Sequence, residues 1–250
     1  MVCVILAAGY CHPAVSFDGT FPEAAFGGGR ETDLDWLIED LEESGEIREY
    51  VVISNHKFAA QFSDWAAERK EKRGWKITVV DDGTETNETR LGAVKDIQFA
   101  MERLGLDDDL LVLAGDNLLD FSLGSFLSYI KEKQASCVMR YVEPSEEKLK
   151  KCGVLSIEED ERILSMVEKP ENPPSHWCCP PFYFYAREDA KRVAEGIAAG
   201  CGTDAPGSFI AWLCRQSPVY AMEMPGSRYD IGNLESYEKV KREYRGIHNI

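Results

Sequence analysis

Short apolar runs alternate with helical patterns along the first half of the chain. The runs are almost unbroken, as expected for strands that helices cover on both faces of a parallel sheet. They are Val2–Leu6, Tyr50–Ser54, Lys76–Asp81 and Leu110–Ala114. Between them, apolar residues recur at helical spacing and predict helices near 34–41, with Asp33 as the N-cap, near 58–66 and near 91–101. This order predicts an α/β fold with a doubly wound, mainly parallel sheet and right-handed crossovers.

After residue 121 the alternation becomes less regular. A helix is predicted near 123–130, and further helices over 187–199, 206–214 and 233–244. The predicted strands of this half are Ser136–Val142, Gly153–Ile157, Ile163–Glu168, Phe182–Tyr185 and Pro218–Met224. We expect this half to extend the sheet, which makes it mixed. We also expect one domain over residues 1–250, in which 122–250 covers the ligand edge of 1–121.

The stretch Leu110–Phe121, LLVLAGDNLLDF, carries the first candidate chemistry. Its apolar run stops at Gly115 and is followed directly by Asp116 and Asn117. Ligands of open α/β sheets bind outside the carboxyl ends of the strands, where Asp116 is expected to lie. Its carboxylate suits a hard cation such as Mg²⁺, which binds oxygen ligands and substrate phosphates. Turn chemistry before a helix capped by Asp120 or Ser122 explains the same residues equally well.

The composition limits the possible partners. The formal net charge of −16 arises from 44 acidic and 28 basic residues. Such an excess argues against non-specific binding to nucleic acid or to an anionic membrane. Any phosphate site must therefore be built locally, from backbone amides, a few cations or a metal ion.

The cysteines and the apolar runs bear on the compartment. The eight cysteines show no CxxC and no metal-ligand spacing, and the adjacent pair Cys178 and Cys179 is interpreted as structural. No signal peptide is visible and no apolar run is long enough to cross a bilayer. Reduced thiols in a cytoplasmic protein are the expected state.

Four motifs, taken in order, resemble the sugar-phosphate nucleotidyltransferase family over nearly the whole chain. They are LAAG at 6–9, GDN at 115–117, EKP at 168–170 and YDIG at 229–232. Members of that family join a nucleoside triphosphate to a sugar 1-phosphate and release pyrophosphate. The resemblance implies the nucleotide-diphospho-sugar transferase (GT-A-like) fold, with 1–121 as the nucleotide-binding half and 122–250 as the sugar-phosphate-binding half. Oligomeric state, including a homo-oligomer, is left open.

The resemblance also implies roles for individual residues. Asp116 and Asp230 are similar to the carboxylates that hold Mg²⁺ against the α-phosphate, and Lys169 to the lysine that contacts the sugar phosphate. Nucleotide-binding positions are implied for Leu6, Ala8, Gly9, Leu91 and Gly92. Three of these assignments have a simpler alternative: Asp230 as a turn residue, Lys169 as a surface lysine, and Leu91-Gly92 as the start of a helix.

The loop after Gly9 departs from the family pattern. The family's loop carries an arginine and a later lysine, whereas this chain has Pro13 and Glu23 at those places. His12 and Arg30 are the nearby substitutes, with His12 more simply a loop residue. Loss of both cations predicts weak triphosphate affinity, because attraction is replaced by repulsion.

Two further positions depart as well. Cys179-Pro180-Pro181 stands where the family has Asn-Ala-Gly, and Arg228 stands where many relatives have an aromatic residue. Two functions therefore stay open: a nucleotidyltransferase weakened at this loop, and an inactive paralogue that binds nucleotide or sugar phosphate as a regulator. A glycosyltransferase of similar fold ranks last, because GDN is not an Asp-x-Asp signature.

Overall fold

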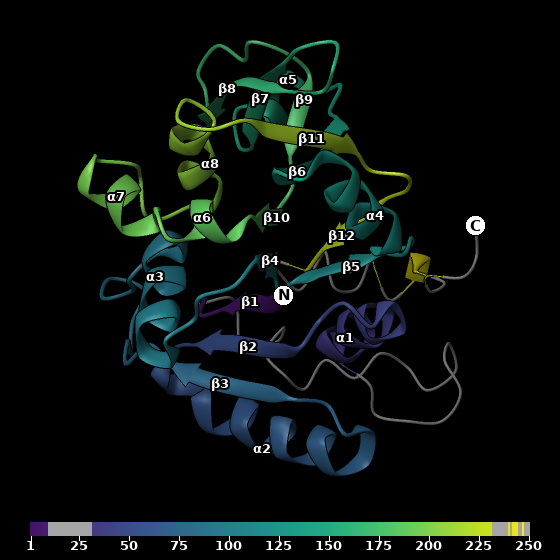
Figure 1. The fold of residues 1–250 in the computed structure, drawn as a ribbon, viewed down its shortest axis with the longest axis vertical. Helices are drawn as coiled ribbons and strands as arrows, with labels where there is room; N and C mark the ends of the chain where they lie inside the picture. The colour runs from purple at the N-terminus through teal and green to yellow at the C-terminus, as the bar shows by residue number, and fades with distance from the viewer. Residues whose placement is uncertain (10–31, 232–239, 241, 245–246, 248–250) are drawn as a thin grey trace.

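The structure, a computed structural model, describes residues 1–9, 32–231, 240, 242–244 and 247 (Figure 1). Within them, ten strands form one sheet in the order β3-β2-β1-β4-β10-β6-β9-β7-β8, with β11 paired to β6. None of the helices in these residues is long and apolar enough to cross a membrane.

The first half of the sheet is parallel, as the apolar runs predict. Its strands are β1 (Val2–Ala7), β2 (Glu49–Ser54), β3 (Ile77–Asp81) and β4 (Leu110–Ala114). Strand β1 lies between β2 and β4, with Val2 in register with both Glu49 and Leu110. The four predicted strands are confirmed, and the helices between them are α1 (Asp33–Ser44), α2 (His56–Arg73) and α3 (Ala93–Leu104).

The second half makes the sheet mixed, which confirms the expected fold class. Strand β10 pairs antiparallel with both β4 and β6, whereas β11 pairs parallel with β6. The strands of this half are β6 (Ser136–Val142), β7 (Gly153–Ile157), β8 (Ile163–Glu168), β9 (Trp177–Cys179), β10 (Phe182–Tyr185) and β11 (Val219–Glu223). Apart from the pair of β11 with β6, the parallel pairs lie among the strands that precede Asp116 in the sequence.

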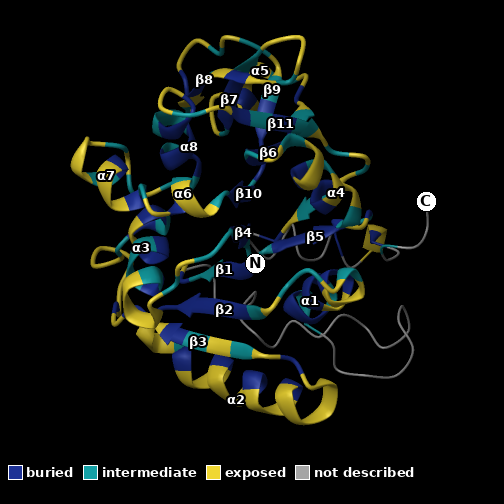
Figure 2. Cartoon of the chain, in the orientation of Figure 1, coloured by how far each residue is buried: buried dark blue, intermediate teal, exposed yellow. Residues whose placement is uncertain are grey.

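Helices cover both faces of the sheet. Alternate residues of β1 separate the two cores: Val2 and Val4 face a cluster with α3, whereas Cys3 and Ile5 face a cluster with α1 and α2. The first face also carries α7 (Val193–Ala198) and α8 (Gly207–Leu213), and the second carries α4 (Gly124–Lys133) (Figure 1). Figure 2 shows β1 and β2 buried and the outward side of α2 exposed.

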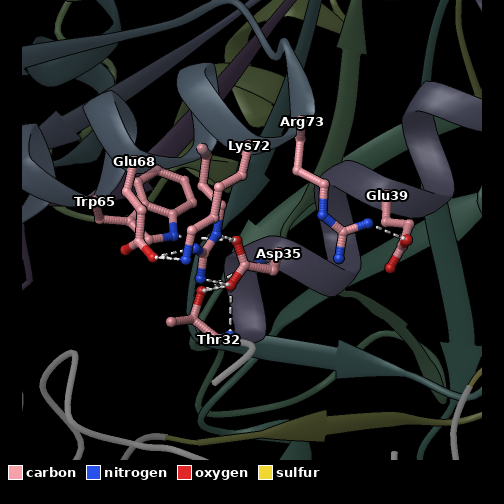
Figure 3. A network of polar contacts seen from close by, with 8 residues as sticks. Thr32, Asp35, Glu39, Trp65, Glu68, Lys72 and Arg73 are labelled. Atoms are coloured by element: carbon pink, nitrogen blue, oxygen red, sulfur yellow. Dashed lines mark hydrogen bonds and ion pairs between the residues drawn. The ribbon is translucent and has the colours of Figure 1, made fainter. Parts of the chain in front are cut away.

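A buried polar network joins α1 to α2 (Figure 3). Asp35 is 1% exposed and accepts hydrogen bonds from the indole of Trp65 (3.1 Å) and from Nη2 of Arg69 (2.8 Å). Thr32 and Asp35 also form a capping box, so Thr32 and not Asp33 is the N-cap of α1. The prediction that Asp33 is the N-cap is wrong. A capping box joins the N-cap to the residue three positions later, and the partner of Asp35 in this box is Thr32.

Several short elements lie outside the predicted pattern. Strand β5 (Asn117–Leu119) pairs antiparallel with β12 (Arg228–Asp230) in a second, two-stranded sheet. The predicted helix over 187–199 is divided into α6 (Arg187–Ala190) and α7, and one turn, α5 (Glu146–Leu149), follows β6. Helix α4 has Leu123 at its N-cap position, although the Ser122 hydroxyl accepts a hydrogen bond from the N–H of Gly124, the first helical residue (3.0 Å). Asp120 instead accepts from the Ser227 N–H (2.7 Å). Most of the predicted helix over 233–244 falls outside the described residues.

Candidate functional site

The connections around β1 create a crevice at the carboxyl edge of the sheet. From β1 the chain passes to β2 and β3 on one side, and it returns to β4 on the other. Such a reversal of strand order is where open α/β sheets bind ligands. A pocket of about 390 Å³ lies there. Its described lining residues are Leu6, Ala7, Ala8, Gly9, Thr32, Asp33, Leu34, Phe58, Phe62, Arg90, Gly92, Ala93, Asp96, Ala114, Gly115, Asp116, Asp204, Pro206 and Ile231.

Backbone pairing brings Asp116 and Asp230 together. The N–H of Gly115 donates to the Leu6 carbonyl (3.0 Å), which holds the end of β4 beside β1. The N–H of Ile231 then donates to the Asp116 carbonyl (2.8 Å), and Asp230 pairs in register with Asn117. Asp116 lines the pocket, whereas Asp230 lies exposed beside it.

The electrostatics of this pair favour a bound cation. Burial, together with the neighbouring charge of Asp230, raises the pKa of the Asp116 carboxyl above its usual value. The amide of Asn117 donates to Asp116 (2.7 Å), and Arg228 donates to Asn117 (2.6 Å) and lies 3.5 Å from the Asp230 carboxylate. In the described part of the chain no group of three or more His, Cys, Asp and Glu side chains could hold a metal ion. The donor set nevertheless fits Mg²⁺, which is commonly held by one or two carboxylates plus substrate phosphates.

The residues after β1 are held in place by Asn55. This fully buried side chain donates to the carbonyls of Ala8 (3.2 Å) and Gly9 (3.4 Å), and its oxygen caps α2 at Phe58 (3.3 Å). One amide therefore positions both the start of the loop and the helix that supplies two aromatic lining residues. Its role depends on tertiary contacts, and the local pattern indicates only that Asn55 closes β2.

Gly92 lies at the wall of the pocket and marks a crossing of two segments. Its φ is +91°, and a Cβ at this position would lie 2.5 Å from the Thr203 carbonyl oxygen. The N–H groups of Ala93 and Val94 donate to the carbonyls of Asp204 (3.2 Å) and Thr203 (3.0 Å). The close approach of Thr203 is thus a structural reason for glycine here, independent of any ligand. Leu91 precedes Gly92 but is not among the lining residues.

Lys169 lies apart from the pocket lining. Its side chain is exposed, its φ is +48°, and its N–H donates to the Cys152 carbonyl (2.9 Å). Burial raises the pKa of its neighbour Glu168, against the charge of Lys169, and smaller contributions from Cys152 and Asp204 raise it further, so Glu168 lies near Asp204. Since Asp204 lines the pocket, Lys169 follows a residue close to its rim.

Three further aspartates line the pocket and were not among the candidates from the sequence. Asp96 and Asp33 have pKa values of about 7, each raised first by burial and then by a nearby carboxylate, Asp82 and Asp116 respectively. Asp204 pairs with Arg90 (2.5 Å), the one cationic residue among the described lining residues. The sequence does contain a signal for Asp96. The residue falls three positions after Ala93 and four before Ala100, which places a carboxylate on the buried face of α3.

The departures in the loop after Gly9 concern residues that the structure does not describe. Pro13, Glu23, His12 and Arg30 all lie between residues 10 and 31. The expectation of weak triphosphate affinity therefore stays a prediction. Cys179 and Pro180 are buried in the sheet region, and Phe182 donates its N–H to the Pro180 carbonyl (2.8 Å), which forms the turn into β10.

Similarity to known proteins covers most of the chain. The sequence model of the family described as "Nucleotidyl transferase" matches residues 22–246. Glucose-1-phosphate adenylyltransferase of Bacillus licheniformis is 26% identical over 144 residues, which are 56% of this chain and 38% of that enzyme. The chain spans well under half the length of the curated relatives that it matches.

Solved structures share the fold. The structure of apo UDP-glucose pyrophosphorylase has a TM-score of 0.76 at 19% identity and covers 97% of each chain. UDP-glucose pyrophosphorylase complexed with UDP-glucose has a TM-score of 0.74 at 18% identity, again over 97% of each chain. At such identities the likeness shows a common architecture.

Proposed function

Because this chain belongs to the nucleotidyl transferase family, we propose that it transfers a nucleoside monophosphate from an NTP to a sugar 1-phosphate and releases pyrophosphate. Two observations support a sugar 1-phosphate as the acceptor. One is the order of the LAAG, GDN, EKP and YDIG motifs, and the other is the presence of sugar-nucleotide enzymes among the similar proteins. Nucleotide-sugar biosynthesis is the corresponding biological role.

One observation carries the proposal: Asp116, Asp230 and the end of β1 meet at one place. Asp116 and Gly9 line the same pocket at the reversal of strand order, and β12 brings Asp230 beside Asp116. A pair of carboxylates beside a pocket of about 390 Å³ suits transfer chemistry on a polyphosphate better than it suits binding alone, because carboxylates repel phosphate unless a cation joins them.

Asp116 and Asp230 would hold Mg²⁺. When bound, the ion would neutralise charge on the phosphate oxygens during displacement. In the reaction, an oxygen of the sugar phosphate forms a bond to the α-phosphorus of the NTP. The bond from that phosphorus to the β-phosphate oxygen breaks, and its electron pair leaves with pyrophosphate. The protein's part is to keep acceptor and α-phosphorus in line.

We assign each of the other proposed site residues to one of the two substrates. Leu6, Ala8 and Gly9 would meet the nucleotide through the end of β1, where Asn55 holds the carbonyls of Ala8 and Gly9. Leu91-Gly92 would contact the nucleotide from the start of α3. Lys169 would contact the sugar phosphate as a mobile point charge, which requires its exposed side chain to reach toward the pocket rim.

A pyrophosphate-release screen tests the function. ATP, GTP, CTP, UTP and dTTP are each assayed with a panel of sugar 1-phosphates and Mg²⁺, with the Asp116→Asn variant as control for contaminating activity. Turnover that depends on one acceptor and is absent in the variant supports the proposal. Binding of nucleotide without pyrophosphate release under every combination would contradict it.

The cytoplasm is our proposed location, because the seven described cysteines are free thiols and most of them are buried. The proposed partners are a nucleoside triphosphate and a sugar 1-phosphate. Neither nucleic acid nor a membrane surface suits the net charge of −16.

A further inference from the structure

Asp96 is a buried carboxylate on the pocket wall, and one of its oxygens has no partner among the described residues. The residue is 5% exposed, and its Oδ1 atom is buried with no hydrogen bond from any described residue. A buried polar atom without a partner destabilises the protein, and does so more strongly when it is charged. Since Asp96 also lines the pocket, a ligand that donates hydrogen bonds to it would remove this cost.

The first turn of α3 does not favour an anion as that ligand, and the cationic lining residue Arg90 is already paired with Asp204. The N–H groups of Ala93, Val94 and Asp96, in the first turn of α3, already donate to the carbonyls of Asp204, Thr203 and Gly92. The start of this helix therefore does not turn these donors toward the pocket. What it presents there is a carboxylate, which accepts hydrogen bonds and repels phosphate.

Asp96 also lies away from the proposed phosphate position. Its charged neighbour Asp82 follows β3 and donates its N–H to the Ser54 carbonyl at the end of β2. Asp116 follows β4, and β1 separates β4 from β2. Strands are spaced about 4.8 Å apart, so roughly 10 Å separate the two positions along the edge of the sheet. A nucleotide with its α-phosphate near Asp116 would place its base near Asp96.

The rest of this end of the pocket suits a planar ring. Phe58 and Phe62 line it from α2, which packs on the face of the sheet opposite to α3. Aromatic side chains on one side and a buried hydrogen-bonding group on the other are typical of a nucleobase site.

We propose that Asp96 reads the nucleobase and selects guanine. This inference rests on the proposed function. An ionised carboxylate offers two acceptors side by side, and guanine places two donors, N1–H and the N2 amino group, next to each other on one edge. Uracil and thymine flank their single N3–H with carbonyl oxygens. Adenine and cytosine present one amino group beside a ring nitrogen that is itself an acceptor. Only guanine satisfies both carboxylate oxygens without opposing two acceptors.

The burial of Asp96 strengthens the discrimination. A buried site that must hydrogen-bond its ligand rejects a ligand without the matching group far more strongly than a solvated site does. Burial raises the pKa of Asp96 to about 7 in the ligand-free protein. Two donors from guanine would stabilise the charged form and lower that pKa again.

Nucleotide binding to the full chain at pH 8, measured by calorimetry with Mg²⁺, tests the inference. GTP is compared with ITP, which lacks the N2 amino group, and with XTP, which replaces it by a carbonyl. We expect ITP to bind about 10-fold and XTP about 100-fold more weakly than GTP, since each lost or opposed buried hydrogen bond costs about 1–3 kcal/mol. ATP, CTP, UTP and dTTP should also bind more weakly than GTP.

The variant Asp96→Asn reverses the pattern. Its amide offers one acceptor and one donor, which match the N1–H and the carbonyl of xanthine, so we expect XTP to become the preferred ligand. Glu102→Gln is the control, because it removes one negative charge from the exposed end of the same helix and should leave the GTP-to-XTP ratio unchanged.

The outcomes separate this inference from the proposed function. Equal binding of GTP and ITP by the parent protein would overturn the role of Asp96 without needing any variant to fold. The role of Asp96 would also be overturned if another base is preferred and Asp96→Asn leaves that preference intact. In either case, pyrophosphate release would still support the proposed transferase function. Absence of both binding and turnover with every nucleotide would overturn the proposed function itself.

Discussion

Asp230 lies beside Asp116 because β12 pairs with β5, and the Ile231 N–H donates to the Asp116 carbonyl over 2.8 Å. The two residues come from distant parts of the chain, and only this two-stranded pairing places both carboxylates near the end of β4. The site therefore depends on the short second sheet as much as on the large one.

Replacing Asp116 should separate metal binding from folding. Asp116→Asn keeps the shape but removes a cation ligand, so Mn²⁺ binding, measured by electron paramagnetic resonance in the presence of NTP, should weaken at least about 10-fold. Asp64→Asn, on the exposed side of α2, is the matched control. Circular dichroism should show both variants folded. Unchanged Mn²⁺ affinity in Asp116→Asn would exclude Asp116 as a ligand.

The raised pKa of Asp96 predicts how stability depends on pH. Its folded value of about 7 lies above the ordinary value of 3.8. The neutral form is favoured in the folded state, so this contribution is complete below about pH 4 and is lost as the pH rises through about 7. Asp96→Asn should therefore gain stability over the parent by up to about 4 kcal/mol at pH 8 and by little at pH 4. Urea denaturation at both pH values measures the difference, and a gain independent of pH would refute the explanation.

The buried ion pair between Asp35 and Arg69 should be the most sensitive contact between α1 and α2. Arg69→Met leaves the Asp35 carboxylate buried without its cation and should cost about 3–5 kcal/mol of unfolding free energy. Lys72→Met breaks an exposed pair with Glu68 on the same helix and should cost at most about 1 kcal/mol. Equal losses in urea denaturation would mean that burial of the pair is not decisive.

Gly92 should be far less tolerant of alanine than Gly105, although both flank α3 and both have positive φ. At Gly105 nothing lies within 4 Å of an added Cβ, so Gly105→Ala should cost only about 1–2 kcal/mol from backbone strain. At Gly92 the added Cβ would meet the Thr203 carbonyl at 2.5 Å, which adds a displacement of the 203–206 segment. Thermal unfolding of the two variants measures the contrast, and similar melting temperatures would show that the Thr203 segment yields freely.

Cys152 should be the most reactive thiol among the described cysteines. A hydrogen bond from Cys178, then one from Tyr141 (3.7 Å between hydroxyl and sulfur), and the charge of Arg228 lower the pKa of Cys152 to about 6, against the effect of burial. Iodoacetamide at pH 7 should modify it faster than Cys201, which is equally half-buried but has a raised pKa. Peptide mass spectrometry measures the rates.

Cys178→Ala supplies the control for that prediction. Because it removes the main hydrogen bond to the Cys152 sulfur, it should slow modification at pH 7 while changing little at pH 10, where a thiol of ordinary pKa is ionised as well. Equal rates for Cys152 and Cys201 at pH 7 would contradict the assigned thiolate.

The sequence by itself determined the elements whose signal is local. Continuous apolar runs identify β1, β2, β4 and β10, because a strand buried on both faces needs only apolar residues in succession. The position of Asp116 at the end of β4 follows from the same run. Gly9 and Asp116 meet at one pocket as expected, since carboxyl ends of neighbouring parallel strands share one edge.

Only the tertiary structure decided the features that depend on contacts between distant segments. Strands β5 and β12 are three residues each, too short for any periodicity, and they exist because they pair with each other. Asp96 has an ordinary place in a helical pattern, and its significance arises from the absence of a donor among the described residues packed around it. Periodicity reports which face of an element is buried, whereas the partner of each buried polar group is set by packing, and the chemistry of the pocket is therefore decided there.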